Sequence, residues 1–111
     1  MTRQWLADPD KMCMSHIAGE HAEAHGFMTK MHREISLDGF IEGSMFFGAE
    51  YVKYRHDLLM VHLPNHTTPL ELDDKVVRDY PLVMPTMDDL KTSLGTLLSR
   101  CNDCLLKHQG K

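Results

Sequence analysis

The stretch DPDKMCMSHIAGEHAEAHGFMTKM, residues 8–31, predicts a long helix that begins at Pro9 and continues to the end of the stretch. Asp8 can cap this helix, and a proline suits its first position because the missing N–H costs nothing there. No further proline interrupts the stretch, although Gly19 and Gly26 each weaken a helix by about 1 kcal/mol relative to alanine. Packing against the rest of the chain must therefore hold this helix in place.

A second helix is predicted from about Ala49 to Leu63. Its apolar side chains recur with the helical period and form one face: Phe47, Tyr51, Tyr54, Leu58 and Val61. Pro64 ends this helix, because the residue before a proline avoids the helical region. Residues 32–48 and 64–69 are expected to be connections.

A third long helix is predicted to begin after Thr86. With Asp89 three residues later, this threonine resembles a capping box in which aspartate replaces the usual glutamate or glutamine. A single apolar stripe follows: Leu90, Leu94, Leu97, Leu98, Cys101 and Leu105. A short helix is predicted over Asp73–Asp79, and extended chain from Tyr80 to Pro85. We therefore expect an all-α fold, with residues 1–111 forming one compact domain of three principal helices and irregular connections.

The composition excludes several classes of protein. Twelve lysines and arginines against sixteen aspartates and glutamates give a net charge of −4, which disfavours a protein that coats duplex DNA electrostatically. No apolar run approaches the roughly 20 residues of a membrane span, so no membrane partner is expected. Three cysteines do not make a full disulfide framework, which favours a reducing cytoplasm. We expect a cytoplasmic monomer.

One face of the first predicted helix carries a histidine and two carboxylates. His16, Glu20 and Glu23 share an arc of about 60° on a helical wheel, with Cys13 and Phe27 on or beside it. Two close carboxylates repel when both are ionised, which raises at least one pKa and can suit it to acid–base chemistry. The alternative is a solvated helix face on which the histidine and the first glutamate form a pair.

A histidine row occupies a different arc of the same helix. It consists of His21, His25 and His32, with Met14 and Met28 beside it. Histidines in this arrangement are common as core or surface residues without a catalytic role, and this interpretation is the favoured one for the row.

Three segments carry a resemblance to a known family. They are Thr2-Arg3 with residues 15–23 (SHIAGEHAE), residues 46–57 (FFGAEYVKYRHD) and residues 66–70 (HTTPL). Together they resemble the pyrimidine-dimer DNA glycosylase family, the endonuclease V type found in phages, and in particular its compact bacterial and phage members. A Thr-Arg start before a His-x-x-x-Glu-x-x-Glu helix is the most specific element. The resemblance covers roughly residues 2–70.

The resemblance implies a DNA repair enzyme, a DNA N-glycosylase with AP-lyase activity, in a bacterium or a phage-infected host cell. Removal of Met1 would expose the α-amine of Thr2, whose ordinary pKa of about 7.7–8.0 leaves a nucleophilic fraction at neutral pH. This amine would attack C1′ of the damaged nucleotide and form an imine, and Glu23 would stabilise the cationic sugar and move protons. Arg3 would hold a phosphate. Judged on residue type alone, an ordinary frayed terminus is the favoured interpretation of Thr2 and Arg3.

The resemblance also implies supporting roles and no cofactor. His16 and Glu20 would orient and tune the catalytic carboxylate, while Lys53, Arg55 and His56 are the basic residues expected to contact damaged DNA. A solvated charged face is the alternative for these three.

The chain departs from the family archetype in two places. Ala22 and Gly26 stand where that archetype has arginines, and residues 104–111 replace its aromatic and basic tail. These differences point to a lesion specificity of its own.

A metal site is the main competing hypothesis. Cys101, Cys104 and His108 share one face of the last predicted helix, and Cys13 or His16 could supply a fourth zinc ligand. Buried thiols that act as small hydrophobic groups are the alternative explanation of these cysteines.

Two further functions remain open. A catalytic metal held by His16, Glu20, Glu23 and either His56 or His66 would suit a hydrolase of nucleotide or DNA phosphoesters. A non-catalytic relative that binds nucleotides or DNA is the other.

Overall fold

The computed structural model describes residues 3–41, 45–63 and 69–109, and these ranges are mostly helical without a strand. The elements are a 3₁₀ helix η1 (Pro9–Lys11) and the α-helices α1 (Met14–His32), α2 (Ala49–Met60), α3 (Asp74–Asp79), α4 (Met87–Arg100) and α5 (Asn102–His108). The prediction of an all-α fold with three principal helices is confirmed. None of the helices in the described ranges is long and apolar enough to span a bilayer.

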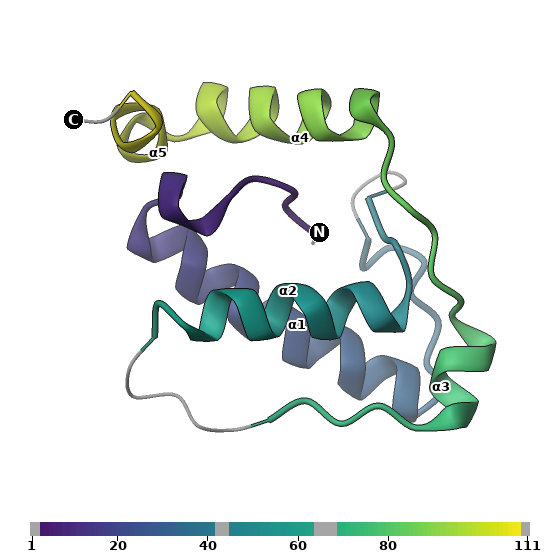
Figure 1. The fold of residues 1–111 in the computed structure, drawn as a ribbon. Coiled ribbons are helices and arrows are strands. Elements are labelled where there is room, and N and C mark those ends of the chain that lie inside the picture. The colour runs from purple at the N-terminus through teal and green to yellow at the C-terminus, as the bar shows by residue number, and fades with distance from the viewer. Residues whose placement is uncertain (1–2, 42–44, 64–68, 110–111) are drawn as a thin grey trace.

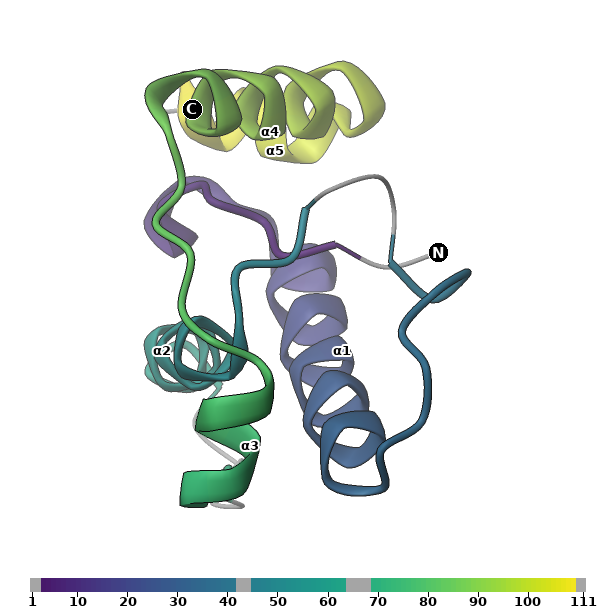
Figure 2. The same ribbon diagram turned by 90° about the vertical axis from the view of Figure 1, so that its right-hand side faces the viewer.

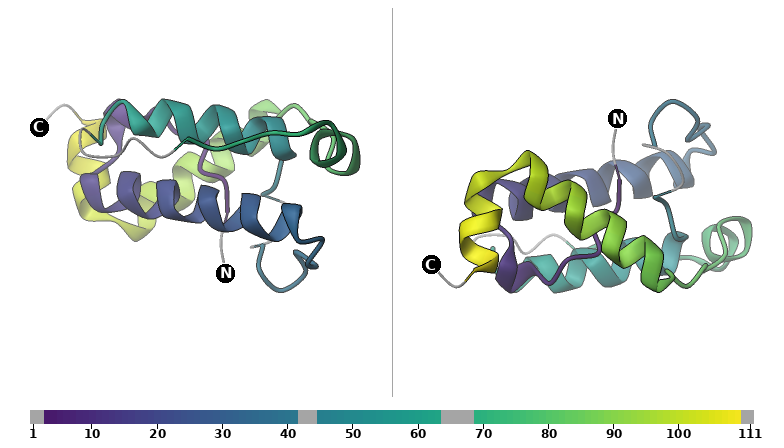
Figure 3. Two further views of the ribbon diagram at one scale, coloured as in Figure 1. Left: turned by 90° about the horizontal axis from the view of Figure 1, so that it is seen from below. Right: turned by 90° about the horizontal axis from the view of Figure 1, so that it is seen from above.

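The helices form two layers with the N-terminal segment between them. Helices α1 and α2 lie side by side and run in opposite directions, and α3 packs against α2 (Figures 1 and 3). Helices α4 and α5 make the other layer, and Figure 2 shows residues 3–12 passing between it and the α1–α2 pair. The N-terminal segment is therefore an interior element of this fold.

The helix predicted from Pro9 is wrong at its start. Asp8 does act as a cap, since its Oδ1 accepts a hydrogen bond from the Asp10 N–H at 2.9 Å, but it caps only the single turn of η1. Met12 and Cys13 are extended, and α1 begins at the next residue. This break turns the Met12 side chain into the core, where it is fully buried.

The apolar face predicted for the second helix is not the face that α2 buries in the core. Tyr54 is 56% exposed and Val61 is 81% exposed. The buried face of α2 is formed instead by Ala49, Val52, Arg55, His56 and Leu59. Because two of these residues are polar, a search for apolar periodicity selects the neighbouring face.

The capping box at Thr86 is confirmed, but the helix that it starts is shorter than predicted. The Thr86 Oγ1 accepts from the Asp89 N–H at 3.1 Å, and the Asp89 carboxylate accepts from the Thr86 N–H at 2.8 Å. Helix α4 ends at Arg100, and the extended Cys101 separates it from α5. The predicted stripe is thereby divided between two helices. The short predicted helix is present as α3, capped by the Asp73 carboxylate.

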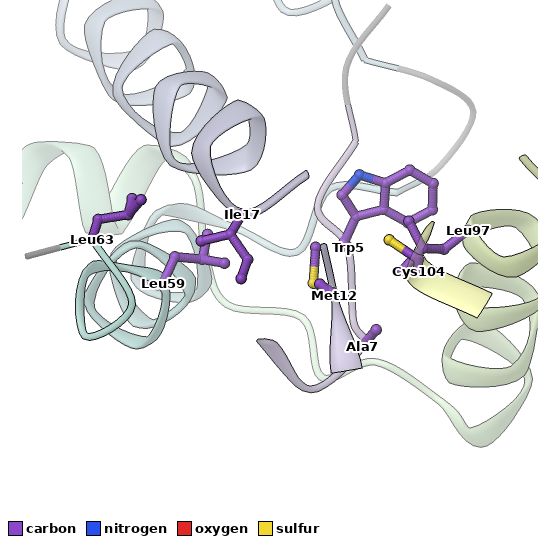
Figure 4. Close-up of a cluster of buried hydrophobic side chains, with 8 residues drawn as sticks. All are labelled: Trp5, Ala7, Met12, Ile17, Leu59, Leu63, Leu97 and Cys104. Carbon is purple, nitrogen blue, oxygen red and sulfur yellow. The ribbon is translucent and has the colours of Figure 1, made fainter. Parts of the chain in front are cut away.

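The core consists of two clusters of buried side chains. The first, drawn in Figure 4, joins both layers through Trp5, Ala7, Met12, Ile17, Leu59, Leu63, Leu97 and Cys104. In that view Trp5 and Met12 lie between the side chains of α1 and α2 on one side and those of α4 and α5 on the other. The second cluster fills the space among α1, α2 and α3. The layers are thus held together largely by side chains of the N-terminal segment.

Gly48, at the start of α2, provides a test of this architecture. Its φ of +96° strains any other residue, and an added Cβ would collide with the carbonyl group of Pro81. We expect Gly48→Ala to lower the free energy of unfolding by at least about 2 kcal/mol in urea denaturation. Gly95→Ala is the control: nothing lies near its Cβ position in α4, so it should raise stability by up to about 1 kcal/mol. Equal effects of the two changes would contradict the close approach at Gly48.

Candidate functional site

A buried ion pair joins α1 to α2 at the centre of the molecule. The Arg55 Nε and Nη2 donate to the two carboxylate oxygens of Glu20 at 2.8 and 2.7 Å, and both side chains are 3% exposed. The remaining arm of the guanidinium, Nη1, donates to the backbone oxygen of Ala7 at 2.8 Å. Arg55 therefore binds α1 and the N-terminal segment at once.

The two partners shift each other's protonation. Burial raises the pKa of the Glu20 carboxyl, an effect that Arg55 opposes and that the negative charge of Glu23 strengthens. Burial disfavours the charged guanidinium, but the hydrogen bonds and charge of Glu20 outweigh this and raise the pKa of Arg55. The influence of Glu23 on Glu20 agrees with the expectation that these two carboxylates are neighbours on one helix face.

The N-terminal segment lies against this pair. Arg3 and Gln4 line a small cavity, of about 10 Å³, together with Glu20, Ala24, Phe27, Val52 and Arg55. The Arg3 guanidinium is largely buried and stands 5.0 Å from the centre of the Trp5 ring. Thr2 lies outside the described residues, but the residue that follows it is thus next to the acidic face of α1. Glu23 is half-buried on that helix and directly precedes Ala24.

The basic residues expected to contact DNA are not gathered on one surface. Lys53 is half-buried and pairs with Asp57 at 3.0 Å, whereas Arg55 and His56 are buried. Asp57 also accepts from the His56 Nδ1 at 2.9 Å. The position of Arg55 is explained by Glu20, whose buried charge requires a partner.

His16 is separated from the carboxylates with which it shares an arc of the helical wheel. Its Nδ1 lies 3.3 Å from the Sγ of Cys13 and 3.6 Å from the Sγ of Cys104, and its ring stands edge-on to Trp5. These are the contacts that His16 makes among the described residues, so the expected pairing of His16 with Glu20 is not formed. The histidine belongs to a cluster of sulfur atoms.

This cluster contains all three cysteines of the chain. The Sγ atoms of Cys13 and Cys101 are 3.7 Å apart, and the ligand atoms of Cys13, His16, Cys101 and Cys104 all lie within 4.8 Å of one another. All three thiols are free. Burial raises the pKa of Cys104 to about 12, while a backbone N–H lowers the pKa of Cys101. His108, expected to join Cys101 and Cys104, is exposed at the end of α5 and lies outside this group.

A second group of imidazoles lies between α1 and α2. The ring of His56 stacks on that of His21 at 4.7 Å and meets that of His25 edge-on at 4.8 Å. One potential ligand atom of each lies within 4.8 Å of the others. His32, the third member of the predicted row, instead pairs with Asp73 at 3.3 Å.

The set proposed for a catalytic metal is not brought together among the described residues. His16 lies with the cysteines, Glu20 is held by Arg55, and His56 lies with the other histidines. His66, the alternative fourth member, is outside the described residues. A wide apolar hollow of about 480 Å³ contains none of the expected site residues; it is lined by Glu50, Tyr51, Tyr54, Leu82, Met84, Pro85 and Leu90.

Comparison of this chain with protein-family models, with curated proteins and with solved structures found no match.

Sequence reasoning identified the first of these arrangements only in part and did not identify the second. The two-residue spacing in Cys13-x-x-His16 is repeated in Cys101-x-x-Cys104, and this repetition is a signal for the complete cysteine cluster. We expected His108 as a ligand because the last helix was assumed to continue through Cys101. To predict the histidine group, one must know that His56 is buried. The nearby basic residues Lys53 and Arg55 instead suggest an exposed surface that contacts DNA. In both cases helix packing across the chain determines the partner.

Replacing Arg55 tests the central ion pair. Arg55→Met retains the length of the side chain but leaves the Glu20 carboxylate buried without a cation, so the free energy of unfolding should fall by about 3–5 kcal/mol. Lys53→Met on the same helix removes only a partly exposed pair with Asp57 and should change stability by about 0.5 kcal/mol or less. Urea denaturation of both variants measures the difference, and similar small losses would contradict a stabilising role for the pair.

Proposed function

We propose that this protein is a DNA glycosylase with AP-lyase activity that uses the α-amine of Thr2 and the carboxylate of Glu23 on damaged DNA. The observation that carries the proposal is the position of Arg3, which lines a cavity with Glu20 and Ala24 on the acidic face of α1. Thr2 directly precedes Arg3 in the sequence, and Glu23 directly precedes Ala24 on that helix. The Thr-Arg start and the His-x-x-x-Glu-x-x-Glu spacing add the resemblance to the pyrimidine-dimer glycosylases.

The chemistry requires a nucleophile with a free lone pair close to a carboxylate. The neutral amine of Thr2 attacks C1′, the bond from C1′ to the base breaks, and the departing base takes up a proton. The sugar ring opens as the nitrogen forms an imine with C1′. Loss of a proton from C2′ then expels the 3′ phosphate by β-elimination. Water finally releases the enzyme from the imine.

The two glutamates have different parts in this scheme. Glu20 is a positioning residue, because Arg55 takes both of its oxygens and fixes the helix face on which Glu23 stands. Glu23 is half-buried and is the carboxylate that would face the cationic sugar and accept the C2′ proton. The cost of extruding a nucleotide, a few kcal/mol, must be offset by local contacts, since a net charge of −4 gives little general attraction to DNA.

A second candidate is a metal-dependent hydrolase of phosphoesters in nucleotides or DNA. The observation in its favour is the group of His21, His25 and His56, whose ring centres are 4.7–4.8 Å apart. Three imidazoles are a known ligand set for catalytic zinc. This enzyme would form no covalent intermediate with DNA, and His25→Ala would remove its activity. A non-catalytic DNA binder would also form no covalent intermediate, but it would have no hydrolase activity for His25→Ala to remove.

Borohydride reduction in the presence of DNA with an abasic site tests the amine mechanism. Protein shown by mass spectrometry to lack Met1 should form a covalent complex with the DNA, because reduction converts the imine to a stable amine. The cross-linked peptide should begin at Thr2. The matched control is protein that retains Met1, whose threonine nitrogen is an amide and cannot react. Absence of a complex with correctly processed protein would exclude this mechanism.

Glu23→Gln tests the assigned carboxylate. We expect base release and strand cleavage to fall by at least about 100-fold, which is the usual contribution of a positioned acid or base. The thermal unfolding temperature should change little, because this side chain is only half-buried. Glu71→Gln, on an exposed residue outside α1, is the control and should retain full activity. A folded and fully active Glu23→Gln protein would refute the assignment.

A further inference from the structure

Two short motifs far apart in the chain meet at one point. Cys13-x-x-His16 lies where the N-terminal segment enters α1, and Cys101-x-x-Cys104 lies at the break between α4 and α5. Their ligand atoms all lie within 4.8 Å of one another. Every cysteine of the chain takes part, although 88 residues separate Cys13 from Cys101.

Three of the six distances between these atoms match the edges of a zinc tetrahedron, and the other three are no longer than 4.8 Å. With Zn–S bonds of about 2.3 Å and a Zn–N bond of about 2.0 Å, tetrahedral geometry separates two sulfurs by roughly 3.8 Å and sulfur from nitrogen by roughly 3.5 Å. The separation of the Cys13 and Cys101 sulfurs is 3.7 Å. The Nδ1 of His16 lies 3.3 Å from the sulfur of Cys13 and 3.6 Å from that of Cys104.

The groups around the cluster suit thiolate ligands. The N–H of Cys13 donates to the sulfur of Cys104 at 3.2 Å, and the N–H of Cys104 donates to the sulfur of Cys101 at 3.4 Å. Such outer contacts orient ligands and disperse their negative charge. The Trp5 ring stands edge-on to the imidazole of His16 and lies beside Cys104 in the core (Figure 4). Cys104 is buried, and the other three ligands are half-buried.

We propose that Cys13, His16, Cys101 and Cys104 bind one Zn²⁺ as a closed structural site that joins α1 to α5. Three sulfurs and one imidazole nitrogen in a tetrahedron are a ligand set typical of structural zinc. The protein supplies all four positions, so no position is open for a catalytic water. The site is separate from the glycosylase chemistry proposed above and does not depend on it.

Zinc at this site would strengthen the attachment of the α4–α5 layer to the rest of the protein. The α4–α5 layer is otherwise attached to the rest of the protein through the N-terminal segment, by apolar contacts and by hydrogen bonds such as Leu6 N–H to Ser93 Oγ at 3.1 Å. The zinc ion would add four strong bonds across this boundary. It would also fix the end of the N-terminal segment at Cys13.

Metal analysis of the purified protein tests the proposal. Protein produced in zinc-supplemented medium and kept reduced should contain one zinc per chain by elemental analysis and native mass spectrometry. Titration of the metal-free protein with Co²⁺ should give the intense visible bands of tetrahedral thiolate coordination. A zinc content far below one per chain together with no such bands would overturn the proposal. So would a Cys13–Cys101 disulfide in protein purified under the same reducing conditions.

Paired variants identify the ligands. Cys101→Ser changes a half-buried residue and should weaken Zn²⁺ binding by more than about 100-fold, since even outer-shell changes cost roughly 10- to 100-fold. His108→Ala, which changes the exposed histidine of the same helix, should bind Zn²⁺ as the unaltered protein does. Equal affinities of the two variants would refute the ligand set.

Hydrogen exchange measures the mechanical role without requiring an assay of activity. Removal of zinc should accelerate exchange of the α4 and α5 amides while the amides of α1 and α2 between Ala24 and Val52 remain protected. Unchanged exchange in α4 and α5 after the metal has been removed would show that the ion does not hold this layer, and would overturn the structural role.

Discussion

The bidentate ion pair between Arg55 and Glu20 is the constraint on which the arrangement of this protein depends. Two charges with 3% exposed side chains are stable only as partners, so α1 and α2 must meet in one register. The third arm of the guanidinium binds the Ala7 oxygen and draws the N-terminal segment into the same contact. Apolar packing alone would allow α1 to slide along α2. The two parallel hydrogen bonds from Arg55 to Glu20 allow only one relative position of these helices.

Once α1 and α2 are fixed relative to each other, the N-terminal segment lies between two different environments, one on the side of α1 and α2 and the other on the side of α4 and α5. Toward α1 and α2 it meets buried charge, including the carboxylate next to which Arg3 lies. Toward α4 and α5 it meets apolar side chains and sulfur, with Trp5 and Met12 between the layers. His16 and Glu20 are one helical turn apart in sequence, yet they belong to these two separate environments. The acid–base and sulfur chemistries can therefore occupy one small domain without sharing a ligand.

The sequence alone predicts well which segments are helical, but it predicts poorly which face of each helix is buried. The capping box at Thr86 places the start of α4, because caps act locally. The prolines are less reliable, since Pro9 begins only the single turn of η1 and α2 ends at Met60, before Pro64. The break at Cys101 could not be predicted, since it follows from contacts with Cys13, far away in the chain. The buried face of α2 was not predicted because it includes Arg55, a charged residue that is buried only through its ion pair with Glu20 on α1. For the candidate site, the spacing of Glu20 and Glu23 predicts their proximity, while the separation of His16 from them depends on tertiary packing.

The interior position of the N-terminal segment has a consequence for how the chain folds. Leu6 bonds to Ser93, and the N–H of Cys13 bonds to the sulfur of Cys104, 91 residues further along. During synthesis, residues 3–12 emerge before α1 and α2 and obtain these partners only after α4 and the start of α5 have been made. The α1–α2 pair can form early from local contacts, but the apolar surface of Trp5 and Met12 stays uncovered until the end. Contacts of such long range slow folding, so a nascent chain of this protein is exposed to aggregation or chaperone binding at its N-terminus.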